Sequence, residues 1–443
     1  MTRPCCSRSC SEPVPSAERK PDHLVQLSWP GRGSQLVTLT ATGKSGGAGE
    51  IFEIDGNPGL LAKIYHTATT QVHLEHYHHK IQWMIDNPPE LPQVPAEYAD
   101  VVQLAWPVAM IVRKSRFIGF AMRKIAFDRT LELDYLLNRR QAASEGFDAD
   151  YGKLVTVSFN LASLIDCLHA KRIAIVDLKP MNVKIYKASL YVSILDCDGF
   201  HIATDEFRSD APQVTPEYLA PEFQDNTVAH PEAQDRFALA TIIFRLLNYG
   251  IHPFSGGAAD RGSYPQELAG RIKQGLYPYG KTANARVRKV PASVHEAFPD
   301  GLRELFDRAF SAGGYSRPSP QEWIDALSIY ASKQSGRMSS CSKGHLRFSD
   351  RPCPTCMRDA LIQGAEVRRR SFLARLQTAP ARTLKYVRQT LRHTHTSPFQ
   401  AALAQAHLTA LQLAPPAPIS TRNAIALEIL WICGLLITYW WTK

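Results

Sequence analysis

Residues 173–187 read IAIVDLKPMNVKIYK, and this stretch decides how the rest of the chain is interpreted. Asp177, Lys179 and Asn182 lie close together between two runs that are rich in β-branched residues. A polar loop between two strands is typical either of a site that holds a nucleotide and a metal ion or of a surface turn. Ile175 and Val176, directly before the aspartate, add no polar group to the loop. The other parts of the chain must therefore decide between these two interpretations.

Charge is unevenly distributed along the 443 residues. Residues 331–443 contain 16 Lys+Arg and 4 Asp+Glu. Residues 1–330 contain 35 Lys+Arg and 37 Asp+Glu. The main globular part is thus almost neutral, and we do not expect a nucleic-acid partner. Nine cysteines without paired spacing do not predict a disulfide framework. No apolar run follows the basic start, so we expect no signal peptide.

The hydrophobic pattern changes its period along the chain. Residues 1–23 have almost no apolar side chains and are predicted to be disordered. From Leu36, short alternating runs separated by glycines predict antiparallel strands, with a helix at 69–86. Helical periodicity then dominates, first at 151–171 and later in the strongly apolar stretch 236–250. Strands followed by helices predict an α+β chain with two lobes.

A glycine-rich hairpin is predicted at TGKSGGAGEIFEI, residues 42–54. It does not match a Walker A loop, because position 38 is Thr and a strand-like run follows instead of a helix. Gly46, Gly49 and Ile51 fit the last part of a glycine-rich loop that covers phosphates, and Gly47 lies within it. The alternative is an ordinary glycine-rich turn without a ligand.

Lys63 is the charged residue of the apolar run LLAKIY. Burying an ammonium group is costly unless an anion accompanies it. Phosphates covered by the hairpin are one such anion, and a helix carboxylate such as Glu75 is another. The alternative is that Lys63 points to solvent from an alternating strand.

Taken in chain order, the hairpin, the strand lysine, the helix glutamate, DLKPMN and ILDCDG resemble the Hanks-type bacterial serine/threonine protein kinases. The resemblance covers about 36–330. TPEYLAPE at 215–222 is similar to the end of an activation segment, and the helix from Asp235 resembles the central helix of the large lobe. The resemblance implies a kinase domain at 24–330, with the small lobe to about 125 and the large lobe after it. It also implies ATP and Mg²⁺ as cofactors and proteins with Ser or Thr as substrates.

The same resemblance assigns roles to individual residues. Asp177 would accept the proton of the substrate hydroxyl, and Lys179 would steady the transferred phosphate. Asn182 and Asp196 would bind Mg²⁺, and Lys63, paired with Glu75, would bind ATP phosphates. The remaining nucleotide contacts would be Gly46, Gly47, Gly49, Ile51 and, in the hinge-like stretch GFAMRKI, Met122. Asp235 would brace the catalytic loop, and Glu222 and Arg317 would form a structural ion pair.

The chain departs from the family pattern at two places. Ile175 and Val176 stand where the family usually has His-Arg. In the family, that arginine normally pairs with a phosphorylated activation segment. Because it is missing here, we do not expect activation by phosphorylation of that segment. Asp196-Cys197-Asp198-Gly199 replaces Asp-Phe-Gly, so that Asp198 competes with Asp196 as the metal ligand. Two other functions stay open: a nucleotide-binding pseudokinase scaffold and a small-molecule phosphotransferase. The 215–222 segment, which shapes a peptide platform, speaks against the latter.

A cysteine cluster follows the kinase-like region, and we assign a zinc ribbon to 338–360. Cys341, His345, Cys353 and Cys356 have the composition and spacing of a tetrahedral zinc set. Four protein ligands leave no open position, so the Zn²⁺ would be structural. The alternative is a reduced loop without metal. Similar short zinc ribbons follow the kinase domain in the bacterial group that the chain resembles.

The C-terminal part combines a basic segment at 361–422 with an apolar segment at 423–441. From Ala424 to Trp441 the only charged residue is Glu428, which predicts a short transmembrane helix. Basic residues before this segment and almost none after it predict a single-pass membrane protein whose kinase domain lies in the cytoplasm. A buried amphipathic helix is the alternative.

Overall fold

The computed structural model describes residues 23–211, 214–224, 228–259, 264–282, 284–311 and 316–377. These residues form two compact units. Unit 1 consists of the chain up to Glu90 together with Asp100–Ala126 and Ser193–Asp198. Unit 2 consists of Leu91–Ala99, Phe127–Val192 and the chain from Gly199 onward. Unit 1 is mainly β-structure and unit 2 mainly helical, as the sequence pattern predicts.

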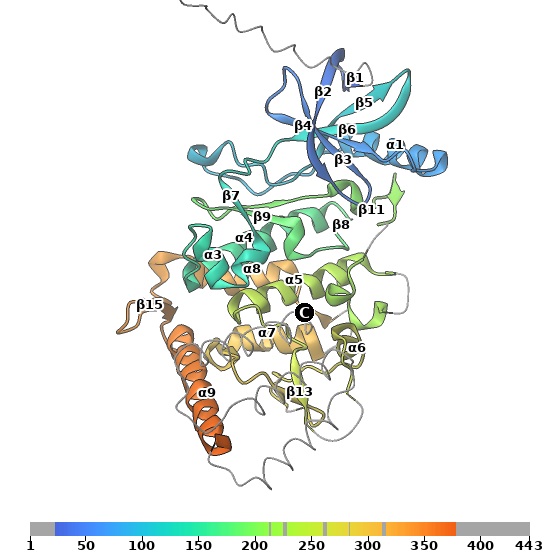
Figure 1. Cartoon of the computed structure of the whole chain (residues 1–443). Helices are drawn as coiled ribbons and strands as arrows, with labels where there is room; N and C mark the ends of the chain where they lie inside the picture. The colour runs from blue at the N-terminus through green and yellow to red at the C-terminus, as the bar shows by residue number, and fades with distance from the viewer. Residues whose placement is uncertain are drawn as a thin grey trace, which may run out of the picture. The chain divides into compact units, whose positions relative to one another are not determined.

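Unit 1 is built around a closed antiparallel barrel with the strand order β1-β2-β3-β4-β6-β5 (Figure 1). The strands are β1 (Leu24–Trp29), β2 (Gly33–Ser45), β3 (Gly49–Ile54), β4 (Leu60–Tyr65), β5 (Pro107–Arg113) and β6 (Arg116–Arg123). Alternating apolar side chains fill its interior, among them Val25, Leu27, Val37, Leu39, Ala109, Ile111 and Ala121. Strand β1 was not predicted, because the predicted strands began only at Leu36.

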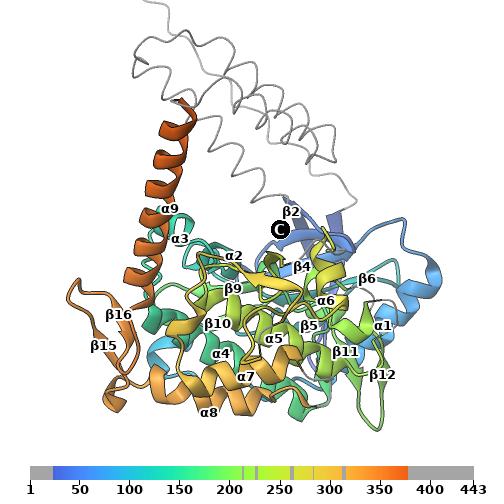
Figure 2. The same cartoon turned by 90° about the horizontal axis from the view of Figure 1, so that it is seen from below.

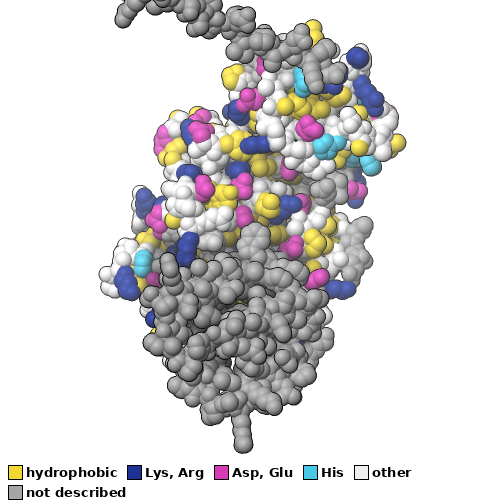
Figure 3. All heavy atoms as spheres, viewed as in Figure 1, with side chains coloured by type: hydrophobic (Ala, Val, Ile, Leu, Met, Phe, Trp, Pro, Cys, Tyr) yellow, Lys and Arg dark blue, Asp and Glu magenta, His cyan; other side chains and the backbone are white. Residues whose placement is uncertain are grey.

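A tight turn and one helix complete unit 1. Lys114 and Ser115 connect β5 to β6 and both have positive φ, 50° and 61°, which suits a two-residue hairpin turn. Helix α1 (Gln71–Asp86) confirms the helix predicted at 69–86 and begins after Thr70, whose hydroxyl caps the His73 amide. It buries an apolar side, chiefly Leu74, Ile81 and Met84. Its exposed side is rich in histidine, which appears in cyan over α1 in Figure 3.

Unit 2 contains most of the helices. They are α2 (Leu133–Leu136), α3 (Arg139–Ser144), α4 (Tyr151–Ala170), α5 (Pro231–Leu247), α6 (Leu268–Lys273), α7 (Asp300–Ser311), α8 (Pro320–Ala331) and α9 (Pro354–Gln377). Its short strands are β7 (Thr130–Glu132), β8 (Ile173–Ala174), β9 (Val183–Tyr186), β11 (His201–Ala203), β12 (Arg208–Ser209), β13 (Gly256–Ala258), β14 (Val287–Lys289), β15 (Met338–Ser340) and β16 (Leu346–Phe348). The remaining strand, β10 (Val192–Ile194), begins at the last residue before the chain returns to unit 1.

The core of unit 2 lies between long helices. Helix α4 packs against both α5 and α8, and α7 packs on α5 (Figure 2). Aromatic rings fill the space around Phe244 of α5, which contacts Phe298, Phe306 and Phe310. This core holds α5 rigidly. The loops that contact the N-terminal end of α5 are therefore held by a rigid helix, through the polar residues Gln234 and Asp235.

Helix α9 runs without a break through residues 360 and 361, where the sequence suggested a boundary between the zinc ribbon and the basic segment. Within the described part of the chain, no helix combines the length and the apolar composition that crossing a bilayer requires. The segment predicted to cross the membrane, 423–441, lies outside the described residues. So do most of the basic segment 361–422 and nearly all of the predicted disordered start, 1–23.

Candidate active site

Lys63 lies on β4, opposite Ile51 of β3, and only 7% of its surface is exposed. Its Nζ lies 2.8 Å from Asp198 Oδ1 and 3.3 Å from Asp196 Oδ1. Burial by itself would lower the pKa of the ammonium group. The two carboxylates, Asp198 more than Asp196, outweigh burial and raise that pKa, so Lys63 remains charged. The sequence-based expectation of a buried lysine with an anionic partner is thus met by the structure.

Glu75 does not take part in this ion pair. It lies on the exposed side of α1, next to the buried Leu74, and accepts a hydrogen bond from Gln71 Nε2 at 2.9 Å. The pairing of Lys63 with Glu75 that the sequence suggested is therefore replaced by pairing with Asp198. The physical reason is the orientation of α1, which turns its apolar residues inward and Glu75 toward solvent.

The two aspartates of the ILDCDG loop differ sharply in their surroundings. The Asp196 side chain is 62% exposed, and its backbone has a left-handed φ of 53°. The Asp198 side chain is 4% exposed and also accepts a hydrogen bond from the Tyr65 hydroxyl at 3.2 Å. Burial, followed by the Asp198 charge, raises the pKa of Tyr65, which therefore stays a donor. Asp196 is open to an incoming metal ion, whereas Asp198 is occupied with Lys63 and Tyr65.

The glycine-rich hairpin joins β2 to β3, with Gly46 donating its amide to the Gly49 carbonyl at 2.9 Å. Gly46 and Gly47 are both exposed, but the Gly46 amide is used inside the hairpin, so Gly47 is the one of the two whose amide could meet a phosphate. Gly49 is buried for another reason: a Cβ there would lie 2.4 Å from the Ile64 carbonyl oxygen, so only glycine fits. Met122 is half-buried near the end of β6, paired with Leu61.

In unit 2 the opening stretch forms a compact polar loop. Lys179 Nζ lies 2.7 Å from Asp177 Oδ2, and the Thr215 hydroxyl donates to Asp177 Oδ1 at 2.6 Å. Lys179 also donates to the Thr215 hydroxyl at 3.0 Å. Asn182 donates its amide nitrogen to the Asp177 carbonyl at 3.2 Å, which leaves its Oδ1 as a metal-ligand atom. Three of the predicted residues are thus brought together, and Thr215 joins them.

The backbone before Asp177 is held from α5. The buried Asp235 carboxylate accepts hydrogen bonds from the amides of Ile175 and Val176, each at 2.7 Å, and from His169 Nε2 at 3.0 Å. The predicted bracing role of Asp235 is therefore seen directly. Val176 has a φ of 65°, an unusual value for a β-branched residue.

The segment at 214–224 is anchored at several points. Glu222 and Arg317 form the predicted ion pair, with Arg317 Nη2 donating to Glu222 Oε2 at 2.7 Å. Burial alone would raise the pKa of Glu222, but the hydrogen bond and charge of Arg317 lower it below its usual value. The backbone carbonyl of Glu217 accepts a hydrogen bond from His252 Nε2 at 3.0 Å. The Tyr218 hydroxyl accepts a hydrogen bond from the Arg245 guanidinium group. These contacts place Thr215 against Asp177.

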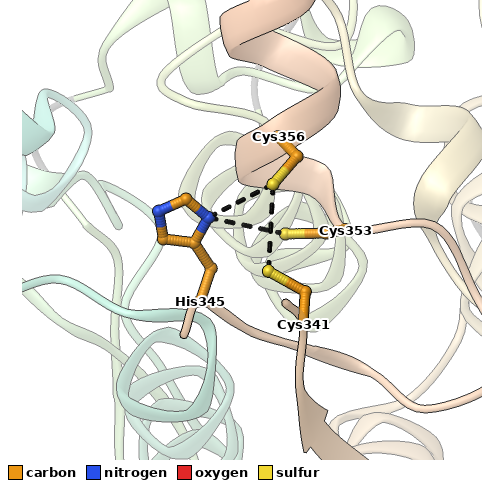
Figure 4. Close-up of side chains that lie close together, drawn as sticks. All are labelled: Cys341, His345, Cys353 and Cys356. Carbon is orange, nitrogen blue, oxygen red and sulfur yellow. Dashed lines mark hydrogen bonds between the residues drawn. The ribbon is translucent and has the colours of Figure 1, made fainter. Parts of the chain in front are cut away.

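The cysteine cluster is assembled in unit 2, where β15, β16 and the first turn of α9 meet (Figure 4). Cys341 Sγ and Cys356 Sγ are 3.8 Å apart, and His345 Nδ1 lies 3.4 Å from Cys356 Sγ and 3.9 Å from Cys353 Sγ. A tetrahedral zinc ion with Zn–S bonds of about 2.3 Å requires ligand atoms roughly 3.5–3.8 Å apart. The four residues therefore fit a structural Zn²⁺ site of the Cys₃His type.

Known proteins are similar in sequence to this chain. Protein kinase YegI of Escherichia coli K12 is 26% identical over 318 residues, which are 66% of this chain and 44% of that protein. Protein kinase YegI of E. coli O157:H7 is 26% identical over 339 residues, which are 71% of this chain and 48% of that protein. The chain is a protein kinase homologue. Serine/threonine-protein kinase 40 of Gallus gallus matches a shorter part, 27% identical over 124 residues, 28% of this chain and 27% of that protein.

The kinase-like chain spans less than half the length of the YegI proteins it matches. No family model matches it. Its fold is nevertheless kinase-like, with a β-rich unit that carries Lys63 and a helical unit that carries the loop with Asp177.

Sequence reasoning missed three polar residues of this kinase-like site. Thr215 is the first residue of TPEYLAPE, but its hydroxyl was not singled out. Tyr65 follows Lys63 by two positions, so both side chains face the same side of β4, and this spacing was a usable signal. Gln234, which binds the backbone of both the catalytic loop and the 214–224 segment, gave no signal beyond being a polar residue next to Asp235.

Proposed function

We propose that this chain is a serine/threonine protein kinase that transfers the γ-phosphate of ATP to protein hydroxyl groups. The observation that carries the proposal is the contact of Asp177 with Lys179 and with the Thr215 hydroxyl, at 2.7 and 2.6 Å. An aliphatic hydroxyl already donates to this carboxylate, which supports Asp177 as the acceptor for a substrate hydroxyl proton. The Lys179 ammonium group beside it suits the charge of a phosphoryl group in transfer.

Each unit also offers an oxygen ligand of the kind that a magnesium–nucleotide complex needs. Asp196 offers an exposed carboxylate and Asn182 an amide oxygen, the oxygen ligands that Mg²⁺ prefers. The bound Mg²⁺ would neutralise phosphate charge during transfer. Lys63 would bind the phosphates from β4, while Asp198 keeps its ammonium group in position. The amide of the exposed Gly47 would contribute a further hydrogen bond.

Incubation of the purified full chain with labelled ATP, Mg²⁺ and generic protein substrates tests the proposal. Asp177→Asn should remove most of the transfer while ATP binding persists. Asp205→Asn is the matched control, because the Asp205 side chain in the same unit is 94% exposed and pairs with the surface residue Arg172. Undiminished transfer by Asp177→Asn would contradict the assignment. ATP binding without any transfer by the unchanged protein would favour a pseudokinase scaffold, and transfer to small alcohols alone would favour a small-molecule phosphotransferase.

We further propose that the chain is a single-pass membrane protein with its kinase units in the cytoplasm. The support comes from sequence: an apolar run from Ala424 to Trp441 that follows a basic segment. Full-length protein should remain in the membrane pellet after a carbonate wash, and a chain that ends at 420 should be released. Release of the full-length protein by salt alone would contradict the anchor.

A further inference from the structure

Val176, the residue before the proposed catalytic aspartate, is held in a conformation that valine avoids. Its φ of 65° lies in the left-handed region, where a β-branched side chain is strained. Such strain persists only where the surrounding structure over-determines the backbone. Here two adjacent residues of α5 do so: Asp235 accepts from the Val176 amide at 2.7 Å, and Gln234 Nε2 donates to the Val176 carbonyl at 3.3 Å.

Gln234 uses its whole amide group. Besides the bond to Val176, its Nε2 donates to the Tyr218 carbonyl at 2.8 Å, and its Oε1 accepts from the Ala220 amide at 2.8 Å. The residue is only 1% exposed, and all three partners are backbone groups. A buried side chain that satisfies three backbone groups from two separate loops fixes their relative position.

These contacts complete a ring of bonds around the catalytic carboxylate. From Asp177 the ring passes through the Thr215 hydroxyl, along the backbone to Tyr218, across the Gln234 amide to Val176, and back along the chain. The ring consists of hydrogen bonds and peptide units. It joins the proposed catalytic loop to the 214–224 segment.

We propose that Gln234 is a positioning residue that locks the 214–224 segment to the catalytic loop and thereby makes phosphate transfer independent of activation-segment phosphorylation. The proposal rests on the proposed kinase function and names the residue that replaces the missing arginine. Gln234 touches neither substrate nor nucleotide; it acts through Val176 and Thr215 on Asp177.

Gln234→Met, which keeps the length of the side chain and removes all three hydrogen bonds, tests the proposal in the full chain. Misplacement of a catalytic group by about 1 Å costs on the order of 10²-fold, so we expect kcat/KM for a protein substrate to fall roughly 10- to 100-fold. ATP affinity should be unchanged. Hydrogen exchange should rise at the amides of 175–178 and 215–222. Wild-type protein treated with a protein phosphatase should keep its activity.

Thr241→Val is the matched control, because Thr241 is fully buried on the same helix and its hydroxyl has no hydrogen-bond partner among the described residues. It should leave both the kinetics and the exchange unchanged. If Gln234→Met does not fold, Gln234→Asn, whose amide is one carbon shorter, provides the same comparison.

Wild-type kcat/KM in folded Gln234→Met would overturn the positioning role. Loss of wild-type activity on phosphatase treatment would overturn the independence from phosphorylation. If the unchanged protein transfers no phosphate to any substrate, the kinase function itself fails. In that case the exchange comparison at 175–178 and 215–222 still decides whether Gln234 locks the two loops together, since unchanged exchange refutes the lock.

Discussion

Replacing Asp198 and Asp196 in turn by asparagine should separate stability from catalysis. The Asp198 carboxylate is 4% exposed and 2.8 Å from Lys63, whereas Asp196 is 62% exposed and 3.3 Å away. Breaking a buried ion pair costs about 3–5 kcal/mol where the partner charge stays buried without compensation. Losing an exposed pair costs about 0–1 kcal/mol. After Asp198→Asn the exposed Asp196 still compensates part of the Lys63 charge, so the free energy of unfolding should fall by somewhat less than about 3–5 kcal/mol, but by more than after Asp196→Asn, where the loss should stay below about 1 kcal/mol.

Catalysis should respond in the opposite order. Asp196→Asn removes the proposed Mg²⁺ ligand and should abolish most phosphate transfer, while the protein unfolds at nearly the wild-type urea concentration. Asp198→Asn should unfold at lower urea and show faster hydrogen exchange at 61–65. The exposed Asp86, which lies on α1 and accepts a hydrogen bond from Gln82, provides the control variant Asp86→Asn, expected to change neither property.

The result that would refute this reasoning is an Asp198→Asn protein of wild-type stability that has lost transfer, beside an active Asp196→Asn protein. Asp198 would then be the metal ligand, and Lys63 would have to find its counter-charge elsewhere.

His295 is buried among aromatic rings, and neither ring nitrogen has a hydrogen-bond partner in the described part of the chain. Burial, then Arg303 and Lys289, lower its pKa to about 3, so only the unfolded chain takes up the proton as pH falls below 6.5. The free energy of unfolding of the wild-type protein should therefore be about 1.4 kcal/mol lower at pH 5.5 than well above pH 6.5. In urea unfolding, His295→Phe should lose less stability than the wild type over the same pH change. An equal loss in both proteins would contradict the assignment. The Cys₃His cluster predicts one zinc per chain, measured by elemental analysis. Cys353→Ser should lower the zinc content and the melting temperature, whereas Cys167→Ser should leave the zinc in place; folded, metal-free wild-type protein would contradict the site.

The sequence predicted those features that depend on local pattern. The alternation in LLAKIY and the helical period of 151–171 correspond to β4 and α4. The spacing of Asp177, Lys179 and Asn182 predicted a shared loop, because residues so close in sequence cannot lie far apart.

The partner of Lys63 could not be predicted in the same way. Three carboxylates were available, one on α1 and two in the ILDCDG loop, and the choice depends on how α1 is turned against the barrel. Gln234 shows a second limit. A single polar residue beside Asp235 does not reveal that its amide spans two loops, since the positions of Tyr218 and Ala220 follow from tertiary packing.

Helix α9 sets a distance for whatever the C-terminal part of the chain binds. Its 24 residues begin at the zinc-ligand cluster and correspond to about 36 Å of helix at roughly 1.5 Å per residue. The cluster clamps the first turn through Cys353 and Cys356, and Arg358 reaches back to the Ala292 carbonyl at 3.0 Å. The helix is thus a spacer fixed at one end. The length of α9 therefore sets how far from the zinc-ligand cluster the chain after Gln377 begins.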